Sequence, residues 1–211
     1  MHRAYTFGER LADGAIHLVG IVGGLIATIY LLGRAFPDLS WSASVSLIIY
    51  GTAMVAMFAF SAAYNLIDVQ AWADRLRRFD QAAIFVKIAG TYTPFAVIKI
   101  GGFAGYGLLV GIWSVALVGI AGKLLSARPW KRTTIFLYLA LGWVGALVAI
   151  FAFDTLSTTS LLLLVAGGLL YSFGLVFHVW SRLPYQNATW HLFVLAATAC
   201  HFLAIASVVF E

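Results

Sequence analysis

Residues 79–95 read FDQAAIFVKIAGTYTPF, an apolar stretch of helix length that carries two ionisable side chains. Asp80 opens the stretch and Lys87 follows seven residues later, which is close to two full turns, so both lie on one helix face. Ionisable groups within an apolar span are costly and mark functional sites. The structural alternative is an Asp in the headgroup layer beside a Lys that snorkels to the membrane surface.

The composition of the whole chain is that of a membrane protein with several spans. Of its 211 residues, 63% are hydrophobic and only 10% are charged, which is untypical of a soluble domain or a disordered chain. Cys200 is the one cysteine, which excludes an internal disulfide and a cysteine-rich metal site. The net charge of +5 does not indicate nucleic-acid binding, because the basic residues lie in short loops between apolar runs. We expect membrane lipids around the protein and no nucleic-acid partner.

The apolar runs are long enough to cross a bilayer as helices. Seven of them cover about residues 15–35, 43–66, 80–99, 103–124, 132–152, 158–180 and 188–210. The polar segment 1–14 has no apolar core of its own and no clear cleavage site follows it, so we expect no cleaved signal peptide. The connections between the runs are short. The sequence therefore predicts an all-α bundle of seven membrane-spanning helices, with residues 1–211 in one domain.

The lysines and arginines are distributed unequally between the two sides of the predicted membrane. Ten of them lie in the N-terminal segment and in the connections after spans 2, 4 and 6: Arg3, Arg10, Arg75, Arg77, Arg78, Lys123, Arg128, Lys131, Arg132 and Arg182. The opposite side holds only Arg34 and Lys99. Because positive residues are enriched in cytoplasmic loops, we predict a multi-pass protein of the cell membrane with a cytoplasmic N-terminus and a C-terminus outside.

In this orientation, several polar side chains lie at one depth near the inner leaflet. Ser61 and Asn65 are one turn apart at the end of the second span, and Asp80 opens the third. Asn187 and His191 are four residues apart at the start of the seventh span. Polar groups within a membrane need partners, so we expect these side chains to share a pocket near the cytoplasmic side.

The start of the first span carries a further polar stripe. Glu9, Asp13 and His17 follow one another at intervals of four residues and so lie on one face of a helix. Pairing between Asp13 and His17 would stabilise the start of that helix. We interpret the stripe as an interfacial helix start rather than as a part of the pocket.

Several segments of the chain, taken in order, resemble the haemolysin III family, the bacterial relatives of the progestin and adipoQ receptors. The matching segments are SAAYN (61–65), FDQAAIF (79–85), AGTYTPF (89–95), YLALGW (138–143), GGLLYSFG (167–174), and RLPYQNATWH (182–191) followed by CHF (200–202). The resemblance implies a seven-helix membrane fold with a zinc site near the cytoplasmic side. It also implies an enzymatic alternative, because some relatives are ceramidase-like amide hydrolases.

The zinc ligands of the family are a His that ends span 2 and two His, four residues apart, that open span 7. A Ser one turn before the first His and the Asp of span 3 lie nearby. Ser61 and Asp80 match these positions, but Asn65 and Asn187 replace two of the three histidines, and only His191 keeps a ligand type. Since a carboxamide is a poor ligand for zinc, the sequence predicts a degenerate zinc site and no zinc cofactor.

Two further departures from the family pattern lie in span 3. Gln81 takes the place of the His that usually follows the Asp, and Lys87 stands where the family is ordinarily apolar. Helical side chains lean toward the N-terminus, so we predict that the Lys87 ammonium points back toward Asp80. In that position it would supply the positive charge that zinc would have given.

Three functions remain open at this point. The first is a zinc-free, receptor-like or membrane-homeostasis protein whose pocket takes a lipid-like ligand. The second is a zinc-dependent lipid amide hydrolase, whose ion would lower the pKa of a bound water; His191 and Asp80 would hold it with weaker ligands. The third is an ion or proton transporter, since buried acidic and basic side chains form such pathways.

Overall fold

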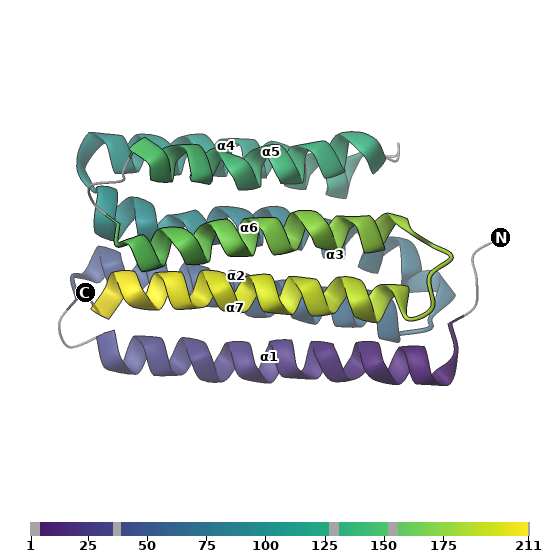
Figure 1. The fold of residues 1–211 in the computed structure, drawn as a ribbon. Coiled ribbons are helices and arrows are strands. Elements are labelled where there is room, and N and C mark those ends of the chain that lie inside the picture. Colours follow the sequence, from purple (N-terminus) through teal and green to yellow (C-terminus); the bar gives the residue numbers. More distant parts are fainter. Residues whose placement is uncertain (1–4, 36–38, 127–130, 152–155, 211) are drawn as a thin grey trace.

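The computed structural model describes residues 5–35, 39–126, 131–151 and 156–210, with only the backbone for 131–132 and 145–151. Four side chains of the predicted basic set lie outside this description: Arg3, Arg128, Lys131 and Arg132. Within it, the chain forms helices joined by short connections (Figure 1).

The helices run the length of the molecule side by side. Their bounds are α1 Phe7–Ala35, α2 Trp41–Leu66, α3 Gln70–Pro94, α4 Gly102–Leu125, α5 Lys131–Phe151, α6 Thr158–Val179 and α7 Gln186–Phe210, and a π-helical segment η1, Phe95–Ile100, follows α3. The predicted all-α fold is confirmed. The chain enters at one end of the bundle and leaves at the other, as an odd number of lengthwise helices requires (Figure 1).

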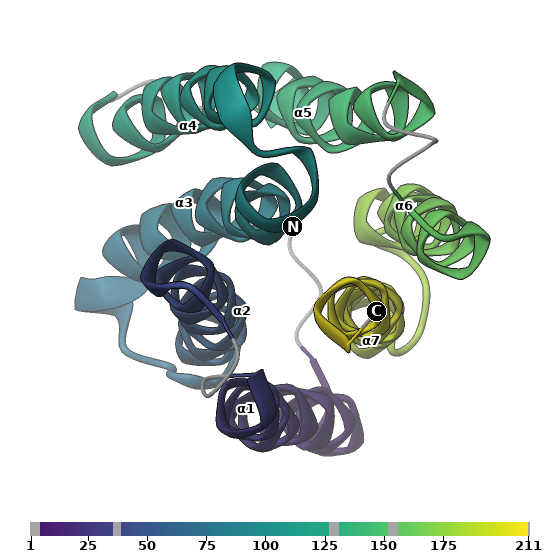
Figure 2. The ribbon, with the colours of Figure 1, turned by 90° about the vertical axis from the view of Figure 1, so that its left-hand side faces the viewer.

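The end view shows how the helices are arranged around one another (Figure 2). Helix α2 packs between α1 and α3, and α3 packs in turn on α4. Helix α7 packs on both α6 and α1. Helices α4 and α5 form a layer along one side. The first and last helices are therefore neighbours, although they are far apart in the sequence.

The outer surface of the bundle is apolar. Phe7, Leu18, Phe103, Leu125 and Leu162 are among its large exposed hydrophobic side chains. Within the described residues, six helices are long and apolar enough to cross a membrane: α1, α2, α3 with η1, α4, α6 and α7. The apolar stretch described in α5 is shorter, Thr133–Val144. This surface suits lipid tails, and the chain is a multi-pass membrane protein.

Glycines bring α2 close to the two helices beside it. A Cβ atom at Gly20 of α1 would lie 2.6 Å from the ring of Phe58 on α2. A Cβ atom at Gly90 of α3 would lie 2.7 Å from the Cβ of Ala53 on α2. Both distances are shorter than carbon atoms tolerate, so these contacts require glycine. They fix α2, and with it the polar residues at its end, against α1 and α3.

Helix α3 begins at Gln70, ten residues before the predicted span. The charged segment before residue 80 continues the helix beyond the apolar stretch, so hydropathy alone found only the part of the helix that crosses the membrane. Asp74 and Arg77 pair at 3.0 Å along the extension. Arg78 donates to the main-chain oxygens of Leu124 and Ser126 at 3.0 and 3.1 Å, and so caps the end of α4.

The far end of α3 changes its winding at Pro94. Proline has no N–H to donate to the preceding turn, and residues 95–100 continue as a π-helix. Gly101 and Gly102 then adopt positive φ angles of 61° and 53°, a conformation that glycine adopts without strain. The chain reverses here into α4.

The orientation of the bundle in the membrane stays a prediction, which rests on the unequal distribution of the basic residues. We expect reporters fused after residue 154, which lies outside the described residues, and at the C-terminus to be found outside the cell. As the control, a reporter fused after Ser126 should be cytoplasmic. A cytoplasmic C-terminus would contradict the predicted topology.

Candidate functional site

Polar side chains from α1, α2 and α7 form a closed ring around Ser61. The Ser61 Oγ atom lies 3.0 Å from His17 Nε2 and 3.2 Å from His191 Nε2. His191 Nδ1 donates to Asp13 Oδ1 at 2.6 Å, and His17 Nδ1 donates to the main-chain oxygen of Asp13 at 2.8 Å. All four residues are buried. We call this set, Asp13, His17, Ser61 and His191, the Ser61 ring.

The N-terminus of α1 is fixed to the start of α7 by a second carboxylate. The side chain of Glu9 accepts hydrogen bonds from the main-chain N–H groups of Thr6 and Tyr185, both at 2.8 Å. Tyr185, just before α7, has a positive φ of 56°, which is uncommon for a residue other than glycine. These contacts bring Asp13 and His17, one and two turns further along α1, against His191.

The Ser61 ring contains more acceptors than hydrogens. A carbonyl or carboxylate oxygen only accepts, so each imidazole donates through Nδ1 to Asp13. In the neutral rings, both Nε2 atoms are then acceptors, and both face the one hydroxyl hydrogen of Ser61. Asp80 of α3 lines the same cavity as Ser61 and His191. Such a cluster favours the transfer of a proton away from Ser61 or the binding of a cation.

The two asparagines that replace the family's histidines bond to each other. Asn187 Nδ2 donates to Asn65 Oδ1 at 2.9 Å. Asn65 Nδ2 donates to the main-chain oxygen of Ser61 at 2.9 Å and lies 3.4 Å from its Oγ. This pair occupies two of the three positions at which the resemblance implies zinc ligands. With one imidazole left, these positions do not fit a zinc ion.

A different group of residues comes close enough to hold a metal. The ligand atoms of Asp13, His17 and His191 all lie within 4.8 Å of one another. Two imidazoles and a carboxylate are a donor set that zinc accepts at catalytic sites. A metal ion between Asp13 and His191 would replace the hydrogen that now joins them at 2.6 Å.

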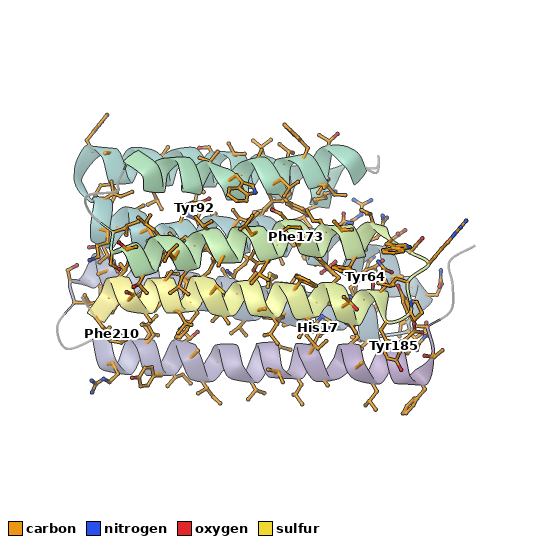
Figure 3. All side chains as sticks on the ribbon, viewed as in Figure 1. His17, Tyr64, Tyr92, Phe173, Tyr185 and Phe210 are labelled. Atoms are coloured by element: carbon orange, nitrogen blue, oxygen red, sulfur yellow. The ribbon has the colours of Figure 1, made fainter. Side chains whose placement is uncertain are left out.

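A large cavity opens beside the ring. Its volume is about 1440 Å³, and helices α2 to α7 contribute to its lining. Five of the predicted pocket residues, near the end of α2, in the first half of α3 and at the start of α7, line it: Ser61, Asn65, Asp80, Asn187 and His191. Figure 3 shows Tyr64, another lining residue, toward the end of the bundle where α1 and α7 begin, and Tyr92 farther along it. The structure thus brings these five residues to one cavity, while their function stays a prediction.

Lys87 lines the same cavity, but its ammonium does not point as predicted. Nζ donates to Thr91 Oγ1 at 2.7 Å, one turn toward the C-terminus, and lies 5.2 Å from the centre of the Tyr50 ring. The residue is 3% exposed, so it does not snorkel either. The predicted approach to Asp80 is wrong, because a hydroxyl and an aromatic face lie within one turn, whereas Asp80 lies two turns away in the opposite direction.

From the sequence we predicted that Asp13 and His17 lie at the membrane interface. Their place in the Ser61 ring was missed. Their spacing of four residues was visible, and the predicted pair exists at 3.7 Å between His17 Nδ1 and Asp13 Oδ2. The shorter bond of Asp13, however, goes to His191 on α7. The spacing along α1 could not show that α7 packs on this face.

Comparison with known proteins identifies the family. Residues 6–202 match the family described as Haemolysin-III related. The chain belongs to the haemolysin III family. It is 34% identical over 201 residues to the Hemolysin-3 homolog of Bacillus subtilis (strain 168), covering 95% of this chain and 94% of that protein. It is 34% identical over 197 residues to Hemolysin-3 of Bacillus cereus, covering 93% and 90%.

The family extends to the progestin and adipoQ receptor relatives. The human Monocyte to macrophage differentiation factor is 29% identical over 206 residues, covering 95% of this chain and 84% of that protein. No solved structure matches the chain. The predicted family and the location in the cell membrane are confirmed by these matches together with the apolar helices.

The asparagine pair leads to a prediction on metal content. We expect the purified protein to carry far less than one zinc per chain, and the double substitution Asn65→His with Asn187→His to raise the occupancy by restoring three imidazoles. Elemental analysis of both proteins measures this. Asn65→Gln with Asn187→Gln, which keeps both carboxamides, is the control and should not raise it. Near-stoichiometric zinc in the unmodified protein would contradict the prediction.

The contacts of Lys87 predict which of its neighbours it is coupled to. Lys87→Met and Thr91→Val should be non-additive in the free energy of unfolding, by at least about 0.5 kcal/mol, because the two side chains share a hydrogen bond. Lys87→Met and Asp80→Asn should instead be additive to within about 0.5 kcal/mol. Unfolding in detergent measures both cycles. Coupling to Asp80 alone would restore the original prediction.

Proposed function

We propose that this protein is a zinc-free, receptor-like member of the haemolysin III family that binds a lipid-like amphiphile in its intramembrane cavity. One observation carries the proposal: a cavity of about 1440 Å³ has polar residues of α2, α3 and α7 in its wall, while most of the remaining wall is apolar. Drug-sized ligands occupy pockets of roughly 300–1,000 Å³. The larger volume and the lipid surroundings favour a long-chain molecule.

The polar part of the cavity suits a small headgroup. Asn65 and Asn187 present amide donors and acceptors, and Asp80 presents a carboxylate. Leu139, Leu164 and Val165 are among the apolar residues that line the cavity elsewhere. A few placed polar groups with apolar walls are the usual composition of a specific small-molecule site.

The same polar groups connect three helices, which supports a receptor-like role. The Ser61 ring joins α1, α2 and α7, and the bond from Asn187 to Asn65 joins α7 to α2 a second time. A headgroup that exchanged hydrogen bonds with the asparagines would change the contact between α2 and α7. Binding would thereby alter the packing of helices that reach the other side of the membrane, provided that the two packings differ in affinity for the ligand.

A second candidate function is a metal-dependent lipid amide hydrolase. The observation that favours it is the donor set of Asp13, His17 and His191, with ligand atoms within 4.8 Å of one another. A zinc ion held by these residues would supply a Lewis acid that polarises a substrate carbonyl. Ser61 and Asp80 would then orient the substrate beside it.

Filling the cavity tests the proposed binding. Gly142 lines the cavity, and a Cβ atom added to it would meet no atom within 4 Å, so the backbone position is open to substitution. We expect Gly142→Phe to weaken the binding of a fluorescent long-chain N-acyl amide several-fold, measured by titration in detergent. Gly111→Phe is the matched control, because Gly111 is also open but does not line the cavity. Equal binding by both variants would contradict the proposed site.

Chelation separates the two candidate functions. The zinc-free proposal predicts that dialysis against EDTA leaves the binding of the N-acyl amide unchanged, since hydrogen bonds of the chain itself hold the headgroup. If the protein loses binding on chelation and regains it on addition of zinc, the metal-dependent candidate replaces the first.

A further inference from the structure

We infer that Ser61, His191 and Asp13 form a metal-independent acyl-transfer site, in which Ser61 is the nucleophile toward the ester or amide carbonyl of a long-chain lipid. The inference rests on the proposed function, because the cavity must admit such a lipid. It goes further in assigning a covalent step to the site.

Three side chains contact one another in the order nucleophile, base and carboxylate. Ser61 Oγ lies 3.2 Å from His191 Nε2, and His191 Nδ1 lies 2.6 Å from Asp13 Oδ1. In this arrangement the imidazole can accept the serine proton through Nε2, while the carboxylate fixes its tautomer and stabilises the imidazolium that forms. The three residues come from α2, α7 and α1, so helix packing assembles the site.

The Ser61 hydroxyl is bonded differently from the hydroxyls of Ser46, which is buried, and Ser172, which is half-buried. A serine within a helix commonly donates to the main-chain oxygen of the preceding turn. Ser46 does so to Ala43 at 2.6 Å and Ser172 to Gly168 at 2.8 Å. The Ser61 hydroxyl instead faces the Nε2 atoms of two imidazoles. Its proton therefore has acceptors that can remove it during a reaction.

Of the two imidazoles that face Ser61, His191 is the better placed to act as the base. Its Nδ1 donates to a carboxylate oxygen at 2.6 Å, whereas His17 Nδ1 donates to a neutral main-chain oxygen. A carboxylate stabilises the positive charge of a protonated imidazole more than a neutral carbonyl does. His191 also lines the cavity, and His17 is not among its lining residues. We assign His17 to the positioning of Ser61.

Amide donors lie beside the nucleophile. Asn65 Nδ2 is 3.4 Å from Ser61 Oγ, and Asn187 Nδ2 has a second hydrogen besides the one that it donates to Asn65. Both residues line the cavity next to Ser61. Side-chain amides are among the groups that stabilise the oxyanion of a tetrahedral intermediate. The two asparagines that replace the family's histidines thus bring amide donors to the wall of the cavity that Ser61 also lines.

The reaction balances with water as the co-reactant. Ser61 Oγ forms a bond to the carbonyl carbon, and its proton passes to His191 Nε2. The tetrahedral intermediate then breaks its bond to the leaving alcohol or amine, which takes the proton from His191. In the second half, water attacks the acyl-serine, gives a proton to His191, and Ser61 regains that proton as the fatty acid leaves. Asp13 does not exchange a proton in either half.

A long-chain alkyl fluorophosphonate tests the inference directly. The reagent loses fluoride as phosphorus forms a bond to an activated serine oxygen. We expect the unmodified protein to acquire one adduct, which peptide mass spectrometry places on Ser61, with the same rate before and after dialysis against EDTA. Ser61→Ala should abolish the adduct. Ser46→Ala, a buried serine on the same helix, is the matched control and should react as the unmodified protein does.

Asp13→Asn separates a positioning role in catalysis from a purely structural one. We expect this substitution to slow the labelling of Ser61 by about ten-fold or more, because the amide no longer stabilises the imidazolium. Binding of the fluorescent N-acyl amide should stay the same, since Asp13 does not line the cavity; it is compared with and without Asp13→Asn in a Ser61→Ala background, so that the amide is not cleaved. If both binding and labelling fall together, Asp13 acts on the fold and the assigned triad is wrong.

The remaining outcomes distinguish the inference from the proposed function. If the unmodified protein binds the N-acyl amide but gives no adduct on Ser61, the inference is overturned and the binding function stands. If it neither binds nor reacts, both are overturned. An adduct that forms only after chelation would show that a metal covers Ser61, and would contradict a metal-independent site.

Discussion

The hydrogen bond between Asp13 and His191, at 2.6 Å, is the interaction on which the site depends. It joins the first helix to the last, and both groups are buried among apolar helices. An ionisable group in such surroundings needs a partner, since burying it alone would cost several kcal/mol. The bond sets the orientation of the His191 ring, the ring directs Nε2 at Ser61, and Ser61 lies at the wall of the cavity.

Asn65 and Asn187, beside the Ser61 ring, also have hydrogen-bond partners within the chain. Where the family resemblance implies imidazoles around zinc, Asn65 and Asn187 bond to each other and to the main chain of α2. Each carboxamide carries both a donor and an acceptor, so the two side chains can bond to each other without an ion between them. The polar end of the cavity is thereby held together by hydrogen bonds of the chain itself. The proposed binding of an amphiphile and the proposed reactivity of Ser61 both follow from this arrangement.

The sequence predicted the helical fold well, because the length and hydropathy of each apolar run determine a membrane helix almost alone. Ser61, Asn65, Asp80, Asn187 and His191 line one cavity, while their depth in the membrane stays a prediction. The sequence could not predict which helices are neighbours, so Asp13 was paired with His17 and its bond to His191 on α7 was missed. The direction of the Lys87 side chain was also not predictable. Helical side chains generally lean toward the N-terminus, but the Lys87 ammonium contacts the Thr91 hydroxyl and the face of the Tyr50 ring.

A double-mutant cycle on Asp13 and His191 tests the central claim most directly. Asp13→Asn, His191→Gln and the double variant would be compared with the unmodified protein by unfolding in detergent. If the two side chains hold each other across α1 and α7, the double variant should lose less free energy of unfolding than the sum of the single losses, by about 1–3 kcal/mol. Additive losses, within about 0.3–0.5 kcal/mol, would show that the two residues act independently and would contradict the account.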